Sequence, residues 1–91
     1  MESVIFVFYT IRENAPNKNW TYSRFPSGWN WTGAGSTSAL NEPVKEFQRE
    51  EQFNGPKNNR LAMKNLLIRV FDTLKRKDVI TKYKIRFSYK P

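Results

Sequence analysis

"SVIFVFYTI", residues Ser3–Ile11, is the clearest β-strand signal in this chain. Every residue from Val4 to Tyr9 favours extended structure, because branched and aromatic side chains pack well on a pleated surface. Both alternating sets of side chains are apolar, a pattern typical of a strand that is covered on both faces. The segment therefore predicts the central strand of an antiparallel sheet.

The end of the chain predicts another strand, of opposite character. Residues Lys82–Lys90 alternate between apolar and mostly basic side chains, so the strand would have one apolar and one positive face. The apolar set is Tyr83, Ile85, Phe87 and Tyr89, and the other set is Lys82, Lys84, Arg86, Ser88 and Lys90. The first set must meet the core, and the second must face solvent.

Residues Lys57–Lys77 predict the most secure helix, directly after the turn-forming Asn54-Gly55-Pro56. Their apolar residues repeat at helical spacing and form a stripe along one side. The stripe consists of Met63, Leu66, Leu67, Val70, Phe71 and Leu74. We expect Lys64 on a flank of this stripe, and Arg69 and Arg76 on the far side, facing water.

The middle of the chain gives weaker signals. Asn19–Phe25 predicts a strand antiparallel to the first one. Leu40–Gln52 fits either a short, solvated helix or a further strand. The Gly- and Ser-rich residues at about 26–38 predict a loop, which lacks the lysine and the spacing of a phosphate-binding motif.

These segments together predict an α+β fold. A small antiparallel sheet would carry one main helix from the C-terminal half on one face, in the order strand, strand, helix or strand, helix, strand. At 91 residues, the chain has room for a single domain, residues 1–91.

The composition excludes several kinds of catalysis. The chain has no cysteine and no histidine, which rules out zinc sites of the usual kind and Ser-His-Asp or Cys-His machinery. No two carboxylates pair on a predicted strand end, as a two-metal nuclease requires. We expect no enzyme, no metal and no cofactor, although a nuclease built on carboxylates and lysine stays open as an alternative.

The charge balance indicates an anionic partner. Sixteen Lys and Arg against eight Asp and Glu give a formal net charge of +8, and so positive a small domain attracts polyanions such as RNA, DNA or an acidic protein surface. We expect no membrane partner, because the apolar run at Val4–Tyr9 is too short to span a bilayer. With no signal-peptide pattern at the start, we expect a cytoplasmic protein.

The basic set of the last strand is the first candidate for phosphate contacts: Lys82, Lys84, Arg86 and Lys90. Lys64, Arg69 and Arg76 of the helix come second. The competing interpretation is an edge strand that uses lysine only to prevent aggregation.

The tryptophans divide into two groups. Trp20, on a predicted strand with Tyr22, is expected in the core. Trp29 and Trp31 lie between glycines, outside any segment whose periodicity turns them inward, so we predict that they are exposed and stack on bases.

The function predicted is a non-catalytic nucleic-acid-binding module, with RNA slightly preferred over DNA. Recognition of double-stranded RNA by shape is a further possibility. The aromatic sheet motif of RRM domains and the Gly-x-x-Gly clamp of KH domains are both missing. The alternative function is that of an inhibitor or accessory factor, viral or phage in origin, whose basic face docks on an acidic protein such as a nucleic-acid enzyme.

Overall fold

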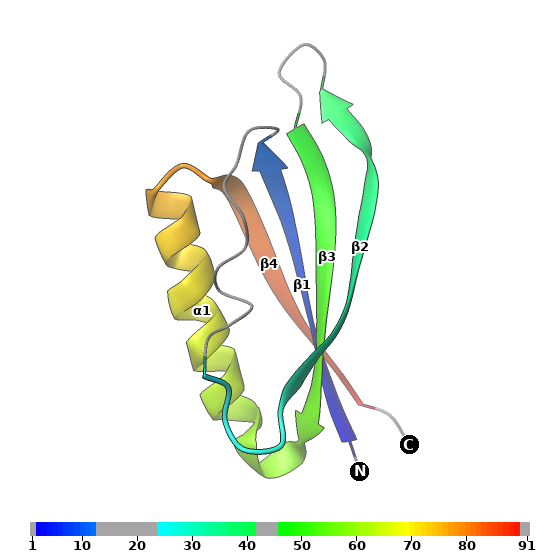
Figure 1. The fold of residues 1–91 in the computed structure, drawn as a ribbon, viewed down its shortest axis with the longest axis vertical. Coiled ribbons are helices and arrows are strands. Elements are labelled where there is room, and N and C mark those ends of the chain that lie inside the picture. The colour runs from blue at the N-terminus through cyan, green and yellow to red at the C-terminus, as the bar shows by residue number, and fades with distance from the viewer. Residues whose placement is uncertain (1, 13–23, 42–45, 90–91) are drawn as a thin grey trace.

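The computed structural model describes residues 2–12, 24–41 and 46–89. Across those residues, four antiparallel strands form one sheet in the order β2-β3-β1-β4, and a single α-helix lies on one face of it (Figure 1). The elements are β1 (Glu2–Arg12), β2 (Asn30–Asn41), β3 (Glu46–Pro56), a 3-10 turn (Lys57–Asn59), α1 (Arg60–Arg76) and β4 (Ile80–Tyr89). The predicted α+β fold is confirmed.

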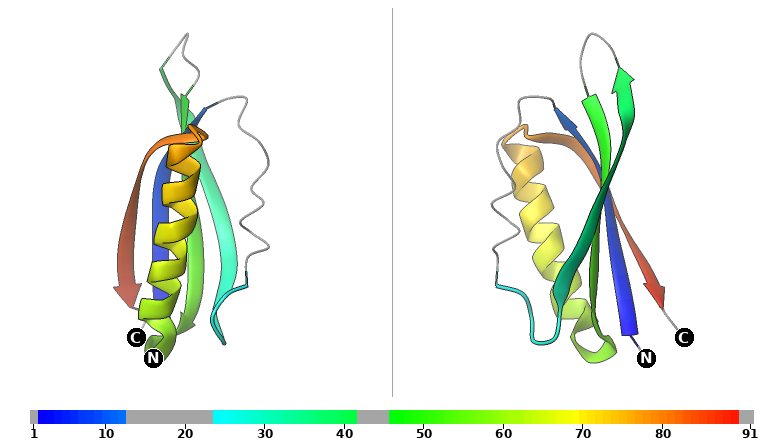
Figure 2. Two further views of the ribbon diagram at one scale, coloured as in Figure 1. Left: turned by 90° about the vertical axis from the view of Figure 1, so that its left-hand side faces the viewer. Right: turned by 45° about the vertical axis from the view of Figure 1, so that its right-hand side comes forward.

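β1 occupies the middle of the sheet, as its sequence predicts, with β3 on one side and β4 on the other. Side chains on both faces of β1 are buried or half-buried, as predicted, with Val4 and Thr10 at 2% and 1% exposure on the face away from the helix. α1 covers the other face, and no described helix or strand lies over the face of Val4 and Thr10 (Figure 2).

The core lies between β1, β3 and α1. Ile5 and Val7 of β1 and Phe53 of β3 are fully buried on the side that faces the helix. Met63, Leu67 and Phe71, the centre of the predicted apolar stripe, are 0–1% exposed. The stripe therefore packs against the sheet as predicted. Partly buried side chains pack around this core, among them Leu66, Val70 and Leu74 of α1 and Tyr83, Ile85 and Phe87 of β4.

The strands in the middle of the chain differ from those expected in their positions. Leu40–Gln52, predicted as helix or strand, contributes its second half to β3, and Asn54-Gly55-Pro56 continues that strand instead of ending it. The Gly- and Ser-rich stretch, predicted as a loop, forms most of β2, because pairing with β3 supplies the ladder that its own composition does not favour. Of the strand predicted at Asn19–Phe25, residues 19–23 lie outside the described part, and Arg24 and Phe25 are in no strand.

Trp29 is a core residue, which corrects the prediction of an exposed ring. It is 3% exposed and covers Gly55 of β3, where an added Cβ would lie 2.2 Å from the indole. Phe25 supports the same end of the core, with its ring edge-on to Phe53 at 5.8 Å between centroids. The indole is buried because a glycine on a distant segment leaves a space of its size, a pairing that local sequence does not reveal.

The turn between α1 and β4 sends the chain back along the sheet. Asp78 takes a left-handed conformation with φ of 63°, while the backbone N–H of Val79 donates to the carbonyl of Leu74 at 2.9 Å and that of Asp78 to Lys75 at 3.1 Å. This pair of bonds is the Schellman motif that ends many helices, usually with glycine at the left-handed position. No helix within the described ranges is long and apolar enough to cross a membrane.

Replacing Gly55 with alanine should destabilise the protein, since the new methyl group would overlap the Trp29 ring. Overpacking of this kind costs about 1–3 kcal/mol. The change should lower the midpoint of urea unfolding, followed by circular dichroism. Gly33→Ala in β2 is the matched control, because an added Cβ there meets nothing within 4 Å; equal stability of the two variants would contradict the packing of Trp29 on Gly55.

Candidate nucleic-acid interface

The face of the sheet opposite α1 presents a row of side chains from β1. Residues along a strand alternate between faces, so Val4, Phe6, Phe8 and Thr10 point away from the helix, while Ile5, Val7 and Tyr9 point toward it. We call this side the open face. Its centre is apolar and aromatic, because it belongs to the strand with two apolar sets.

Phe6 and Phe8 form an aromatic pair on the open face. Their ring centroids are 6.1 Å apart and their planes differ by 22°. Both rings are half-buried, in contrast to Val4 and Thr10 at 2% and 1% exposure. The pair therefore presents two nearly parallel rings, partly accessible to solvent, in the middle of the sheet.

A basic row from β4 flanks the aromatic pair. Lys82, Lys84 and Arg86 are exposed, and the register places them directly opposite Thr10, Phe8 and Phe6. Within residues 2–12, 24–41 and 46–89, none of the three cations forms an ion pair with a carboxylate. The predicted solvent-facing, positive side of the last strand is confirmed for these residues, while Lys90 lies outside the described part.

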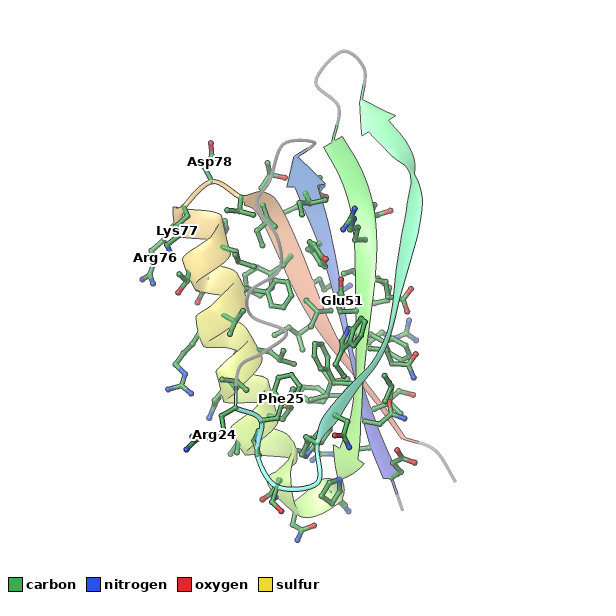
Figure 3. The ribbon with its side chains drawn as sticks, in the orientation of Figure 1. Arg24, Phe25, Glu51, Arg76, Lys77 and Asp78 are labelled. Carbon is green, nitrogen blue, oxygen red and sulfur yellow. The ribbon has the colours of Figure 1, made fainter. Side chains whose placement is uncertain are left out.

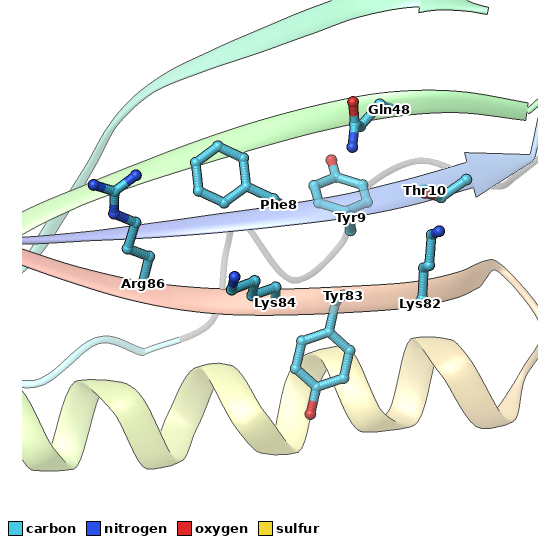
Figure 4. Close-up of a pocket in the computed structure, with 8 residues that line it drawn as sticks. All are labelled: Phe8, Tyr9, Thr10, Gln48, Lys82, Tyr83, Lys84 and Arg86. Atoms are coloured by element: carbon cyan, nitrogen blue, oxygen red, sulfur yellow. The ribbon is translucent and has the colours of Figure 1, made fainter. Parts of the chain in front are cut away.

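A shallow groove of about 410 Å³ runs along this junction (Figure 4). Its lining combines the basic row with β1 and one residue of β3: Phe8, Tyr9, Thr10, Gln48, Lys82, Tyr83, Lys84 and Arg86. The three cations point away from α1, whereas Tyr83 points toward it. The groove is thus lined by the ring of Phe8 and by the three cations of β4.

A polar row from β3 borders the aromatic pair on its other side. Gln48, Glu50, Gln52 and Asn54 pair with Thr10, Phe8, Phe6 and Val4 on the same face. The Gln52 amide donates to the Asn54 side-chain carbonyl at 3.3 Å, and the Thr32 hydroxyl donates to the same oxygen at 3.0 Å. The open face therefore consists of three parallel stripes: basic on β4, aromatic on β1 and polar on β3.

The helix residues predicted as secondary phosphate contacts do not join the basic row. Arg69 and Arg76 are exposed on α1, and Figure 3 shows Arg76 pointing away from the sheet. The Nζ atom of Lys64 lies 5.6 Å from the ring centre of Phe87, on the helix side of β4. The structure therefore separates these cations from Lys84 and Arg86 by the thickness of the sheet.

Trp31 is 43% exposed, but it lies on the helix side of β2 rather than on the open face. Its indole N–H donates to the fully buried carboxylate of Glu51 at 2.8 Å, and the Tyr9 hydroxyl donates to the same group at 2.5 Å. Burial first, and then the Glu51 carboxylate, raise the pKa of Tyr9 and keep it a donor. Trp31 thus helps to satisfy a buried charge and is not placed beside the basic row.

The sequence interpretation missed Phe6, Phe8 and Glu50. The two phenylalanines belong to a segment whose pattern predicts cover on both faces, and Glu50 lies in Leu40–Gln52, which fits either a helix or a strand. The sequence does contain an indication of this site. Phe6 and Phe8 alternate along the first strand as Lys84 and Arg86 do along the last, so the two sets can lie side by side on one face of a sheet. Reading it requires the knowledge that β1 and β4 are neighbours, which only the fold supplies.

Comparisons with protein-family models, curated proteins and solved structures give no significant match. In the described part of the chain, no group of three or more His, Cys, Asp or Glu residues could hold a metal ion.

Tyr83 fixes β4 to the helix and so orients the basic row. Its ring lies 5.7 Å from that of Phe71, and its hydroxyl donates to Asp72 at 2.6 Å. Desolvation, followed by the hydrogen bond to Asp72, raises the pKa of Tyr83 from 10.0 to about 12. Because the folded-state pKa is raised, the contribution to stability is complete below pH 10 and is lost as the pH rises toward 12.

Asp72→Asn should lower the pKa of Tyr83 toward its ordinary value, because the acceptor loses its negative charge. Titration of ¹³C-tyrosine signals by NMR measures the shift, and Tyr83→Phe assigns the signal. An unchanged Tyr83 titration in Asp72→Asn would contradict the hydrogen bond between α1 and β4.

Proposed function

We propose that the protein is a non-catalytic binding module for single-stranded nucleic acid, with RNA slightly preferred over DNA. The observation that carries this proposal is the position of Lys84 and Arg86 directly opposite Phe8 and Phe6 on the open face. Each ring has a cation beside it, so one nucleotide can place its base on the ring and its phosphate on the cation.

The two contacts differ in chemistry and reinforce one another. Every base has an aromatic face, so stacking on phenylalanine is tolerant of sequence and contributes about 1–3 kcal/mol per base. The neighbouring cations attract the backbone and release its counterions. Cations that form no ion pair among the described residues repel one another, and an anionic ligand would relieve that repulsion.

The distribution of cations favours a single strand over a duplex. Stacking on Phe6 and Phe8 needs unpaired bases, which a duplex does not offer. Contact with successive grooves of double-stranded RNA would need Lys64, Arg69 and Arg76 on the same surface as Lys84, and they lie on the helix side. We place RNA first because aromatic sheet faces most often recognise unpaired RNA.

An acidic protein partner is the second candidate. The observation that favours it is the edge position of β4, since a partner strand could pair with its outer side while carboxylates meet the basic row. An inhibitor of a nucleic-acid enzyme would dock in this way. Binding of an acidic protein would depend on the basic row and not on the aromatic faces of Phe6 and Phe8.

Fluorescence anisotropy with a short, labelled, unstructured RNA tests the proposal. If three phosphates contact the basic row, the logarithm of the affinity should fall against the logarithm of the salt concentration with a slope of about −2, at roughly −0.7 per phosphate. Lys84→Glu with Arg86→Glu should abolish binding at moderate salt. The matched control, Arg69→Glu with Arg76→Glu, changes the net charge equally on the other side of the molecule and should leave binding largely intact.

Phe8→Leu separates stacking from charge, because leucine keeps an apolar side chain in the strand and removes the aromatic face. It should weaken RNA binding by about 5- to 100-fold, the loss of one stacked base, and leave the salt slope unchanged. Equal effects of the two charge-reversed pairs would place the ligand elsewhere. An absence of RNA binding at low salt would reject the function and favour the acidic protein partner.

A further inference from the structure

Glu50 is the one acidic member of the polar row, and it sits beside an aromatic ring. It is half-buried and pairs with Phe8 across β3 and β1, while Lys84 pairs with Phe8 from the other side. Within the described residues, the Glu50 carboxylate has neither a hydrogen-bond nor an ion-pair partner. A half-buried carboxylate that bonds to none of the described residues can accept hydrogen bonds from a ligand.

The neighbouring strand leaves space beside this carboxylate. β2 pairs Gly35 with Glu50 and Gly33 with Gln52, so its residues at these positions carry no side chain. A Cβ at Gly33 would meet nothing within 4 Å, which shows that packing does not demand a glycine there. The space beside Gln52 is therefore open on the side of β2.

Lys84, Phe8 and Glu50 form a line across three strands. Adjacent strands lie about 4.8 Å apart, so the line is about 10 Å long, similar to one nucleotide from phosphate to base edge. The carboxylate repels phosphate and the lysine attracts it. These charges orient a nucleotide with its phosphate over β4, its base on Phe8 and its Watson–Crick edge at Glu50.

We propose that Glu50 selects guanine at the base stacked on Phe8, an inference that rests on the proposed binding of single-stranded nucleic acid. An ionised carboxylate only accepts hydrogen bonds, and its two oxygens suit two parallel donors. Guanine offers such a pair, N1–H and the N2 amino group. Uracil offers one N–H between two carbonyl oxygens, which a carboxylate repels.

The test compares a short RNA of alternating uridine and guanosine with oligouridine of the same length. The wild-type protein should bind the alternating RNA about tenfold or more tightly, within the range measured for one bidentate base contact. Inosine in place of guanosine removes the N2 amino group and should remove much of this preference. Glu50→Gln should reduce the ratio of the two affinities to near one.

Glu2→Gln is the matched control. Glu2 is an exposed carboxylate at the end of β1, on the same face by register, and its substitution changes the net charge by the same amount. It should raise the affinity for both RNAs slightly and preserve their ratio. Circular dichroism of each variant verifies that the fold is intact.

Equal affinity of the wild-type protein for both RNAs, or a ratio that survives Glu50→Gln, would overturn the role of Glu50 while leaving single-strand binding in place. Failure to bind either RNA at low salt would overturn the proposed function, and the selectivity with it.

Discussion

The register between β1 and β4 is the constraint on which both faces of this protein depend. A shift by one residue would move every side chain of β4 to the opposite face. Tyr83, Ile85 and Phe87 would then face solvent, and the basic row would lie under the helix, where the desolvation of unpaired ammonium groups is costly. Tyr83 reinforces the observed register, because it contacts both Phe71 and Asp72 of α1. The same register places Lys84 and Arg86 beside the aromatic pair.

The aromatic side chains fall into two sets with different physical roles. On the helix side, Trp29 covers Gly55, and Tyr9 with Trp31 satisfies the buried carboxylate of Glu51. Large rings suit this task because a domain of this size buries a smaller fraction of its surface than a larger domain does and needs much area from each residue. On the open face, no described helix or strand packs on Phe6 and Phe8. Their remaining accessible surface makes them suitable for stacking with a ligand.

Much of the fold could be predicted from the sequence, because α1 and β4 carry complete local patterns. The stripe around Met63, Leu67 and Phe71 and the alternation of β4 each specify which side faces the core. The other elements depend on contacts distant in sequence. β2 forms from a glycine- and serine-rich stretch because β3 pairs with it, and Trp29 is buried because Gly55 leaves room for its ring.

The candidate site could be predicted only where a local sequence pattern specifies it. The exposure of Lys82, Lys84 and Arg86 follows from alternation within one strand. Of the two tryptophans predicted to be exposed, Trp31 is 43% exposed and Trp29 is buried at 3% exposure. The alternation within β1 places the half-buried Phe6 and Phe8 on the face away from the helix. The polarity pattern of one strand distinguishes a solvent-facing side from a core-facing side. It does not determine whether a helix covers one or both faces when both sets of side chains are apolar.

The net charge of +8 acts on a ligand in two separate ways. The cations of α1 lie beyond the sheet from the open face, and the Debye length at physiological salt is about 8 Å, so their field there is largely screened. In the proposed complex they would contribute to the first attraction of a polyanion and little to the bound state. The cations of β4 line the groove itself, where they would contact a phosphate at short range. The position of charge relative to Phe6 and Phe8, rather than its total, therefore sets what this surface can bind.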